Sequence, residues 1–541
     1  MTNEPAVTVS IRDLTIRLPA GADREYAVSA MNVDVPAGKI TCIVGESGSG
    51  KSLAARAIMQ LLPPGVSVER GSVHFGSVNL IDLDPSAIRK LRGNRIAMIF
   101  QDPMTALNPL QTIGKQLQEV FVLHTSLSRD ERKQRAIALL ESVNLPDPSR
   151  MMDSYPHQLS GGQRQRAMIA MALALEPDLV IADEPTTALD VTTQAQILRL
   201  LADLQRTRKT GILFITHDFG VVAEIADEVV VMQHGEVVEQ GSAGTVLGNP
   251  QHPYTRALIA AAPKLTSPPV RPAPKNRPLV VGSGIHKTYE SRRLFGQSRA
   301  VHALTEVDIV LNEGETLGLV GESGSGKSTL ARVVTRLTEA SGSLEIAGRE
   351  TLHLNRKQLK PIRKDMQMVF QDPYASLDPR FKVVDIVAEG PIIHGTPRDA
   401  AHERARELLS LVGLSPAAAD RYPHEFSGGQ RQRIGIARAL ALDPKILVAD
   451  EPVSALDVSV QSKVLALLAD IRQKFGLAML FVTHDLRIAL QICDRIAVMR
   501  QGRIVEIGTA QQIYSDPQHP YTRALFAAIP GGQHQLGNIH A

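Results

Sequence analysis

The chain has 541 residues, of which 43% are hydrophobic and 21% charged, with a net charge of +3 and two cysteines. This composition is typical of a soluble globular protein, the length predicts three or four units at ~150 residues each, and the charge balance neither requires nor excludes nucleic acid. Cys42 and Cys493 exclude a disulfide framework or a four-cysteine cluster, no apolar run is long enough to cross a membrane, and the N-terminus has no signal-peptide pattern.

Two glycine-rich segments have the pattern of a phosphate-binding loop. Residues 40–52 (ITCIVGESGSGKS) and 316–328 (TLGLVGESGSGKS) each place an apolar run before a glycine turn and a Lys-Ser pair, which predicts a strand, a loop and a helix. The glycines let backbone N–H groups converge on a phosphate, and the helix N-terminus adds its positive dipole. A turn that binds nothing is disfavoured by two full matches. We expect ATP contacts from Gly45, Glu46, Ser47, Gly48, Ser49, Gly50, Lys51, Ser52, Leu53, Gly321, Glu322, Ser323, Gly324, Ser325, Gly326, Lys327, Ser328 and Thr329.

A serine–glycine motif precedes a second helical pattern in each half. LSGGQ and FSGGQ occur at residues 159–163 and 426–430, and a helix that opens with Ser-Gly-Gly offers a second anion-binding N-terminus. A flexible turn alone does not explain why SGGQRQR appears twice. The residues that we expect to contact nucleotide here are Ser160, Gly161, Gly162, Gln163, Ser427, Gly428, Gly429 and Gln430.

An acidic motif follows in both halves. The runs LVIADEP and ILVADEP predict buried parallel strands, and ligands of such sheets bind beyond the carboxyl ends of the strands. We therefore expect Asp183 and Asp450 to hold a metal, and Glu184 and Glu451 to polarise the attacking water. A solvent-facing acidic pair would explain one such motif, but here both follow a phosphate loop.

The chain is an internal duplication. Tyr155 and Tyr422 are 267 residues apart, and the same spacing separates the later motifs of the two copies. Between the copies, proline is dense enough to prevent regular structure and to favour an extended spacer. We place the first domain at residues 1–262, the linker at 263–279 and the second domain at 280–541.

Together these motifs resemble those of the ABC (ATP-binding cassette) ATPases over nearly the whole chain, and the SGGQ signature is specific to that family. The resemblance implies an α/β fold of two tandem P-loop NTPase cassettes, each with a RecA-like core, an antiparallel β subdomain and an α-helical signature subdomain. It also implies ATP hydrolysis, with ATP and Mg²⁺ as cofactors.

Further residues take roles from this resemblance. The FQDP glutamines resemble the Q-loop, which senses Mg²⁺ and water and faces a permease, and the THD histidines resemble the switch that contacts the γ-phosphate. Asp190 and Asp457 resemble the D-loop. The implied catalytic residues are Glu184, Glu451, His217, His484, Gln101 and Gln371. The implied metal ligands are Ser52, Gln101, Asp183, Ser328, Gln371 and Asp450.

In this family each ATP lies between the phosphate loop of one cassette and the signature of the other. Carried over, one site combines Lys51, Asp183, Glu184 and His217 with Ser427, Gly429 and Gln430, and the other combines Lys327, Asp450, Glu451 and His484 with Ser160, Gly162 and Gln163. Both sites have every catalytic residue type, so we expect both to hydrolyse ATP.

The first nucleotide pocket departs from the family pattern in two places. Leu53 stands where the second copy has Thr329, so the first site lacks one hydroxyl near the α-phosphate. Tyr289 occupies the position of the adenine-stacking aromatic, where the first copy has Leu18, with Tyr26 as a candidate substitute. We therefore expect unequal nucleotide affinities at the two sites.

The motif HPYTRAL occurs at residues 252–258 and 519–525. Its Pro253 fits an ordinary helix start, and the motif is similar to the C-terminal element of the oligopeptide/dipeptide/nickel importer ATPases, whose two ATPase subunits this chain resembles in fused form. The resemblance implies a peripheral motor at the cytoplasmic face of a bacterial inner membrane. Its partners would be two integral-membrane permease subunits and an extracytoplasmic solute-binding protein, with no nucleic acid and no iron–sulfur cluster.

The main alternative is a soluble twin-cassette ATPase that acts on ribosomes or nucleic acid. Such proteins usually carry a long charged helical linker, whereas the linker here is short and proline-rich. DNA-repair ABC ATPases have zinc-binding cysteines that this chain lacks, and a non-hydrolysing regulator would not need Glu184 and Glu451. Peptides are the leading solute by resemblance, and the sequence does not separate them from glutathione, nickel chelates, antibiotic peptides or opines.

Overall fold

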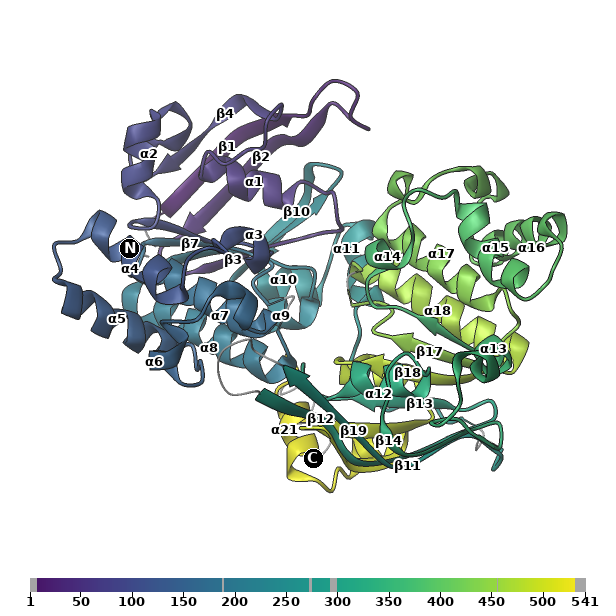
Figure 1. The fold of residues 1–541 in the computed structure, drawn as a ribbon. Coiled ribbons are helices and arrows are strands. Elements are labelled where there is room, and N and C mark those ends of the chain that lie inside the picture. The colour runs from purple at the N-terminus through teal and green to yellow at the C-terminus, as the bar shows by residue number, and fades with distance from the viewer. Residues whose placement is uncertain (1–6, 187–188, 272–274, 292–298, 455, 531–541) are drawn as a thin grey trace. The chain divides into compact units, whose positions relative to one another are not determined.

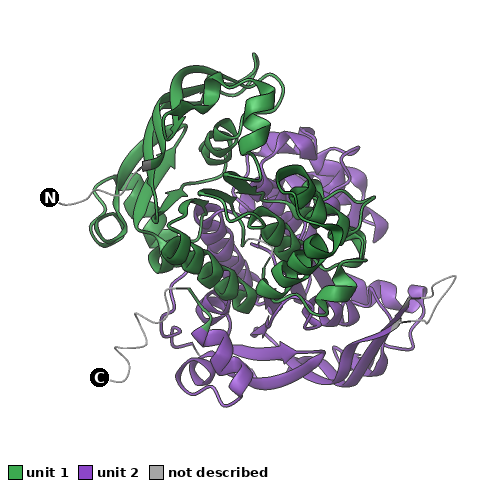
Figure 2. Ribbon diagram, turned by 90° about the vertical axis from the view of Figure 1, so that its left-hand side faces the viewer, with its two compact units in different colours: residues 1–262, 528–541 green, residues 263–527 purple. Residues whose placement is uncertain are grey.

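The computed structural model describes residues 7–186, 189–271, 275–291, 299–454 and 456–530. The chain divides into two compact units (Figure 2): a first unit of residues 1–262 with 528–541, and a second unit of residues 263–527. None of the helices in these described ranges is long and apolar enough to cross a membrane.

The first unit is built on two sheets. Its six-stranded sheet has the order β10-β9-β3-β8-β7-β6 and is parallel except for β10. The strands are β3 (Ile40–Val44), β6 (Ile96–Ile99), β7 (Leu179–Asp183), β8 (Gly211–Ile215), β9 (Glu228–Gln233) and β10 (Glu236–Ser242). An antiparallel sheet of order β2-β1-β4-β5 contains β1 (Val7–Arg17), β2 (Tyr26–Pro36), β4 (Ser67–Phe75) and β5 (Val78–Asn79).

The helices of the first unit lie beside both of its sheets (Figure 1). They are α1 (Lys51–Ile58), α2 (Pro85–Leu91), α3 (Pro103–Ala106), α4 (Ile113–His124), α5 (Arg129–Ser142), α6 (Pro148–Met151), α7 (Gly161–Ala172), α8 (Val191–Arg208), α9 (Phe219–Ile225), α10 (Ala243–Gly248) and α11 (Pro253–Ala261). Alternate side chains of β3 enter two separate cores: Cys42 and Val44 pack with α4, α7 and α8, whereas Ile43 packs with α1 and the antiparallel sheet.

The second unit repeats this arrangement. Its six-stranded sheet has the order β16-β17-β18-β13-β19-β20, with strands β13 (Thr316–Val320), β16 (Met366–Val369), β17 (Ile446–Asp450), β18 (Ala478–Thr483), β19 (Arg495–Arg500) and β20 (Arg503–Thr509). Its antiparallel sheet contains β11 (Pro278–Ser291), β12 (Arg299–Asn312), β14 (Ser341–Ile346) and β15 (Arg349–Glu350). Its helices are α12 (Lys327–Val334), α13 (Arg356–Asp365), α14 (Pro373–Ser376), α15 (Val383–Ile393), α16 (Arg398–Leu411), α17 (Gly428–Leu440), α18 (Val458–Phe475), α19 (Leu486–Ile492), α20 (Ala510–Ser515) and α21 (Pro520–Ala527).

The strands that the motifs predict are present in both units. The apolar runs before the phosphate loops are β3 and β13, and those before the acidic pairs are β7 and β17. All four strands are fully buried and parallel to their neighbours, because both faces of the sheet are covered, in the first unit by helices on one face and by α1 and the antiparallel sheet on the other.

The linker has no helix or strand between residues 263 and 271, as its prolines predict. It is nevertheless bound to the second unit, of which it forms the first residues. The Arg271 guanidinium donates hydrogen bonds to the backbone carbonyls of Gln491 and Cys493, at the end of α19. Ser267 adds a hydrogen bond of 3.3 Å to Gln511. The spacer is therefore anchored to the second unit at Ser267 and Arg271.

The two buried cysteines occupy complementary positions in the two copies. By the repeat, Cys42 on β3 corresponds to Gly318 on β13, and Cys493 at the end of α19 corresponds to Ala226. A Cβ atom on Gly318 would lie only 2.7 Å from the Cys493 sulfur. Each core thus has room for one cysteine side chain at this contact. In the first unit it is Cys42 of the strand, and in the second unit it is Cys493 at the end of the helix.

This packing predicts that a second substitution will restore stability lost through the first. Gly318→Cys should destabilise the second unit by about 1–3 kcal/mol, because it overfills a packed core. Adding Cys493→Ala recreates the pairing of the first unit and should recover most of that loss. Thermal unfolding of the full chain measures both effects; two independent, additive losses would contradict the packing argument.

Candidate active sites

The phosphate loops join β3 to α1 and β13 to α12. Gly50 and Gly326, with φ of 103° and 106°, stand immediately before the helices. A Cβ atom would lie 2.3 Å from the Ala27 carbonyl oxygen at Gly50 and 2.6 Å from that of Ala303 at Gly326. Both the left-handed conformation and the close backbone approach therefore require glycine.

The lysine of each loop is buried and held by the loop itself. The Lys51 Nζ atom donates hydrogen bonds to the carbonyl oxygens of Gly45 and Glu46, both at 2.8 Å. Lys327 makes the equivalent bonds to the loop of the second unit at 2.7 and 2.9 Å. Since a buried ammonium is costly without partners, these bonds fix the cation at the carboxyl edge of the sheet, where phosphates are expected.

The helix serine and the acidic strand end meet in both units. The Ser52 hydroxyl donates to Asp183 at 2.8 Å, and that of Ser328 donates to Asp450 at 3.0 Å. Burial raises the pKa of both aspartates, and the neighbouring glutamate adds to this. A nearby cation would reverse that shift, since it favours the ionised carboxylate.

This donor set fits Mg²⁺ together with phosphates. Mg²⁺ takes hard oxygen ligands and is usually held by one or two carboxylates plus substrate phosphates. Each unit offers a hydroxyl and a carboxylate in contact, with a glutamine nearby, and the described residues contain no cluster of three or more His, Cys, Asp or Glu that would form an all-protein cage.

The glutamate after each aspartate lies between a glutamine and a histidine. In the first unit the Gln101 amide donates to Glu184 at 3.0 Å, and His217 Nδ1 lies 3.4 Å from the other carboxylate oxygen. The corresponding distances to Glu451 are 3.1 Å from Gln371 and 3.1 Å from His484. The sequence-predicted residues therefore converge at the ends of β7, β8, β17 and β18.

Both glutamates adopt a left-handed backbone conformation, with φ of 47° at Glu184 and 45° at Glu451. This conformation is uncommon for a residue with a side chain and is found at functional sites that the surrounding structure holds in place. Here the N–H of each glutamate donates a hydrogen bond to a backbone carbonyl near the end of the adjacent strand. The acceptors are Ile215 for Glu184 and Val482 for Glu451.

The histidines carry a shifted pKa. Burial would lower the pKa of His217 and His484, but the hydrogen bond and charge of the adjoining glutamate outweigh burial, so both values lie above the ordinary one. In the second unit, burial would raise the pKa of Glu451, and His484 holds it below its ordinary value.

The signature residues cap helices within their own units. Ser160 accepts the N–H of Gln163 at 3.3 Å, and the Gln163 side chain accepts the N–H of Ser160 at 3.0 Å. Ser427 and Gln430 form the same capping box at 3.4 and 3.0 Å. Gly161, Gly162, Gly428 and Gly429 form the first turns of α7 and α17. Among described residues, each of these serine and glutamine side chains accepts from the backbone N–H of the other residue of its capping box and not from the phosphate loop of its own unit.

The remaining predicted residues also have defined surroundings. Asp190 and Asp457 cap α8 and α18. Tyr289 is 41% exposed, with the Lys287 ammonium 5.1 Å from the centre of its ring. The Tyr26 hydroxyl instead bonds to Arg17 and Glu69, at 3.3 and 3.2 Å. Leu18 and Leu53 pack against the core of the first unit.

One contact to the phosphate loop is absent from the sequence predictions. The hydroxyl of Tyr254 in the first HPYTRAL element accepts the N–H of Glu46 at 3.0 Å, and Tyr521 does the same for Glu322 at 3.1 Å. These partners are 208 and 199 residues apart. The repetition of the HPYTRAL motif after both cassettes is the only signal in the sequence that points to this contact.

The chain matches the ABC transporter family over residues 28–187 and 304–454, and the family described as "Oligopeptide/dipeptide transporter, C-terminal region" over residues 238–297 and 505–540. It is 47% identical over 529 residues to the peptidoglycan transport ATP-binding protein YejF of Agrobacterium fabrum, with 96% of each chain covered. It is 46% identical over 556 residues to the glutathione import ATP-binding protein GsiA of Escherichia coli K12, covering 96% of this chain and 89% of that one.

A solved dimeric structure of a bacterial ABC transporter cassette is 30% identical, with a TM-score of 0.40, over 43% of this chain and 98% of that chain. The family matches confirm the predicted fold of two tandem cassettes and the predicted ATPase activity.

The histidine pairs predict a pH dependence. His217 and His484 should titrate above the ordinary value, so the His–Glu attraction is fully present below about pH 6.5 and is lost as the pH rises through the folded pKa. Glu184→Gln and Glu451→Gln should each lower the pKa of the adjoining histidine. Histidine hydrogen–deuterium exchange measures these values.

His394 serves as the control, because burial and the charges of Lys360 and Lys364 lower its pKa. A pKa of His484 at or below that of His394 in the unmodified chain would contradict the described pairing.

Proposed function

The chain belongs to the ABC transporter family, and we propose that its two cassettes form two composite ATP sites that drive uptake of a peptide-type solute through two separate permease subunits. The observation that carries the proposal is the duplication of the complete set: each unit joins a phosphate-loop lysine, a serine–aspartate pair and a Gln–Glu–His group at one sheet edge. The alternative of a twin-cassette ATPase on ribosomes or nucleic acid is not favoured, because importer ATP-binding proteins match 96% of the chain.

Each group has a chemical role in hydrolysis. The lysine neutralises the β- and γ-phosphates, and the glutamate orients the attacking water, since phosphoryl transfer depends on positioning and electrostatic stabilisation. The histidine shares that carboxylate and faces the γ-phosphate. Mg²⁺ would be held by the serine, the aspartate and the Q-loop glutamine, and it supplies charge neutralisation on the phosphates.

The signature helices would complete each site. α7 and α17 have 12 and 13 residues and begin with exposed Ser160 and Ser427. Their N-terminal N–H groups and dipoles favour an anion, which supports γ-phosphate contact from the opposite cassette. Because the side chains of Gln163 and Gln430 close the capping boxes, we expect serine and glycine to make the first contacts with phosphate.

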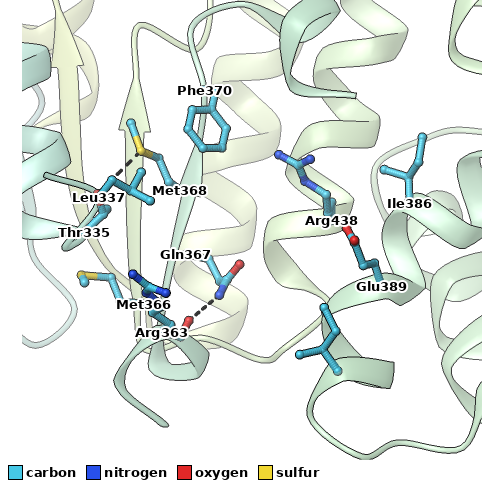
Figure 3. A pocket seen from close by; sticks show the side chains of 12 residues that line it. Thr335, Leu337, Arg363, Met366, Gln367, Met368, Phe370, Ile386, Glu389 and Arg438 are labelled. Atoms are coloured by element: carbon cyan, nitrogen blue, oxygen red, sulfur yellow. Dashed lines mark hydrogen bonds between the residues drawn. The ribbon is translucent and has the colours of Figure 1, made fainter. Parts of the chain in front are cut away.

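A pocket beside the second Q-loop supports the permease assignment (Figure 3). It has a volume of about 320 Å³ and lies between β16 with its following loop and helices α15 and α17. Phe370, at its wall, directly precedes Gln371, whose amide holds Glu451. A permease segment seated here would therefore contact the chain one residue from the catalytic group.

The pocket is lined by apolar and polar side chains, among them the partly buried Arg438. The Arg438 guanidinium lies 5.8 Å from the Phe370 ring and near Glu389, and it donates to the Ser376 carbonyl at 2.6 Å. Burial lowers the pKa of Arg438. The first copy has Met171 at the corresponding position, so the two units offer chemically different surfaces. This difference favours two non-identical permease subunits.

For the transported solute we propose a chemical class and not one compound. The relatives named above are, by name, peptidoglycan and glutathione transport proteins, and both solutes contain peptide bonds or peptide-like linkages. We propose an oligopeptide-like solute, delivered by an extracytoplasmic solute-binding protein, with this chain at the cytoplasmic face of the membrane.

Removal of the catalytic carboxylates tests the motor. Glu184→Gln with Glu451→Gln should lower ATP turnover by about 100-fold or more, because the water loses its orienting carboxylate. In liposomes that contain the two permeases and the solute-binding protein, uptake should stop with it. Glu176→Gln, at an exposed carboxylate paired with Arg208, is the control. Wild-type ATP turnover in the double variant would contradict the catalytic role of the two glutamates. Co-purification of the chain with ribosomes instead of permeases would contradict its proposed function as an importer subunit.

A charge at the pocket rim tests the docking surface. Ile393 lines the pocket and is 58% exposed, so Ile393→Glu should place a charge against the permease segment and weaken co-purification of one permease subunit by about 10-fold, the factor of 1.4 kcal/mol. Ile507→Glu, at a 41% exposed residue of β20 outside the pocket, should leave co-purification intact. Equal effects of the two substitutions would contradict docking at this pocket.

A further inference from the structure

The first HPYTRAL element is fixed to strand β10 on one side. Glu239 of β10 accepts hydrogen bonds from the backbone N–H groups of Gln251 at 2.7 Å and His252 at 3.0 Å. The Nδ1 atom of His252 then accepts the N–H of Tyr254 at 3.2 Å, which caps the start of α11. The position of Tyr254 is thereby tied to the β9–β10 hairpin.

On the other side, the element contacts one peptide unit of the phosphate loop. The N–H of Glu46 donates to the Tyr254 hydroxyl at 3.0 Å, and the carbonyl of the same peptide unit, that of Gly45, accepts from the Lys51 ammonium at 2.8 Å. Because a carbonyl that accepts from a cation polarises its own peptide N–H, the two bonds strengthen each other. The tyrosine therefore acts on the lysine through a single peptide group.

The β9–β10 hairpin also contacts the phosphate loop. The N–H of Gly235, at the hairpin turn, donates to the Ser49 carbonyl at 3.1 Å. A Cβ atom on Gly45 would lie 2.2 Å from the Met232 carbonyl oxygen, so the backbone of the phosphate loop is closely packed against β9. The hairpin and the tyrosine it positions hold the loop from two directions.

The second unit repeats every contact of this arrangement. Its bonds are Glu322 N–H to the Tyr521 hydroxyl at 3.1 Å, Lys327 to Gly321 at 2.7 Å, Gln518 and His519 N–H to Glu506 at 2.7 and 3.0 Å, Tyr521 N–H to His519 at 3.1 Å, and Gly502 N–H to Ser325 at 2.9 Å. A motif that served only to start a helix would not need its hydroxyl at the phosphate loop twice.

We propose that Tyr254 and Tyr521 are positioning residues for ATP: each holds the first peptide unit of its phosphate loop so that the loop and its lysine are in place before the nucleotide binds. A binding site that is already ordered loses less conformational freedom on binding, and affinity rises accordingly. The HPYTRAL element is thus a structural part of the nucleotide site. This inference rests on the ATPase activity alone and needs neither the permeases nor the solute.

The test removes only the hydroxyl groups. Tyr254→Phe, Tyr521→Phe and the double variant are compared with the unmodified full chain in ATP and AMP binding and in ATP turnover. For each altered site, the Kd and KM for ATP should rise about 3- to 10-fold, which corresponds to the ~1 kcal/mol net value of one hydrogen bond. The kcat at saturating ATP should stay within about twofold, and AMP, which has no β- or γ-phosphate for the lysine, should bind as before.

The matched control is Tyr514→Phe, because Tyr514 of α20 packs edge-on against Phe526 of α21, the helix that contains Tyr521, with ring centres 6.4 Å apart, and the Tyr514 hydroxyl has no described bond to the phosphate loop. Unchanged ATP affinity in the double variant would overturn the proposal. So would an equal loss for ATP and AMP, or a lower thermal unfolding midpoint with intact ATP affinity, since either result assigns the hydroxyls to the fold alone. Absence of solute uptake by the unmodified chain, with normal ATP binding, would count against the importer and not against this inference.

Discussion

The buried ammonium of the phosphate-loop lysine is the constraint on which each site depends. Lys51 and Lys327 are only 6% and 4% exposed, and a buried cation without partners would be strongly destabilising. The loop supplies carbonyl oxygens on one side, and a nucleotide would supply phosphates on the other. That solution requires a strand followed by glycine turns, a helix that starts at the lysine, and a nearby parallel strand that ends in a carboxylate. The parallel order of β3, β8 and β7 meets these requirements in the first unit.

The two copies share the lysine, serine–aspartate and Gln–Glu–His groups of the proposed sites and differ at positions beside them. The loop bonds, the serine–aspartate contacts and the Gln–Glu–His groups have nearly equal lengths in both units. Differences occur at Leu53 and Thr329, in the nucleotide pocket, and at Met171 and Arg438, at the pocket beside the Q-loop. Divergence at these positions supports the proposal that the two units differ in permease contact and in nucleotide affinity while they share the groups expected to bind phosphate.

The sequence predicts the site as far as local patterns reach. Glycine turns before Lys-Ser and apolar runs before Asp-Glu are short-range patterns with one physical solution, and the structure brings Lys51, Ser52 and Asp183 together accordingly. Contacts across about 200 residues have no such pattern, so the bond from Tyr254 to the loop was not predicted from the sequence. The anchoring of Arg271 was missed for the same reason, because proline content describes the linker backbone but not what its side chains bind.

The placement of each catalytic glutamate explains how an event at the pocket could reach the chemistry. Glu451 is held in a left-handed conformation by its N–H bond to Val482, and its carboxylate is shared by Gln371 and His484. Phe370 joins Gln371 to the pocket wall through one peptide bond. A shift of that wall would therefore move the amide that holds the carboxylate. Because phosphoryl transfer depends on the position of the attacking water, we propose that displacement of this glutamine changes the rate of hydrolysis.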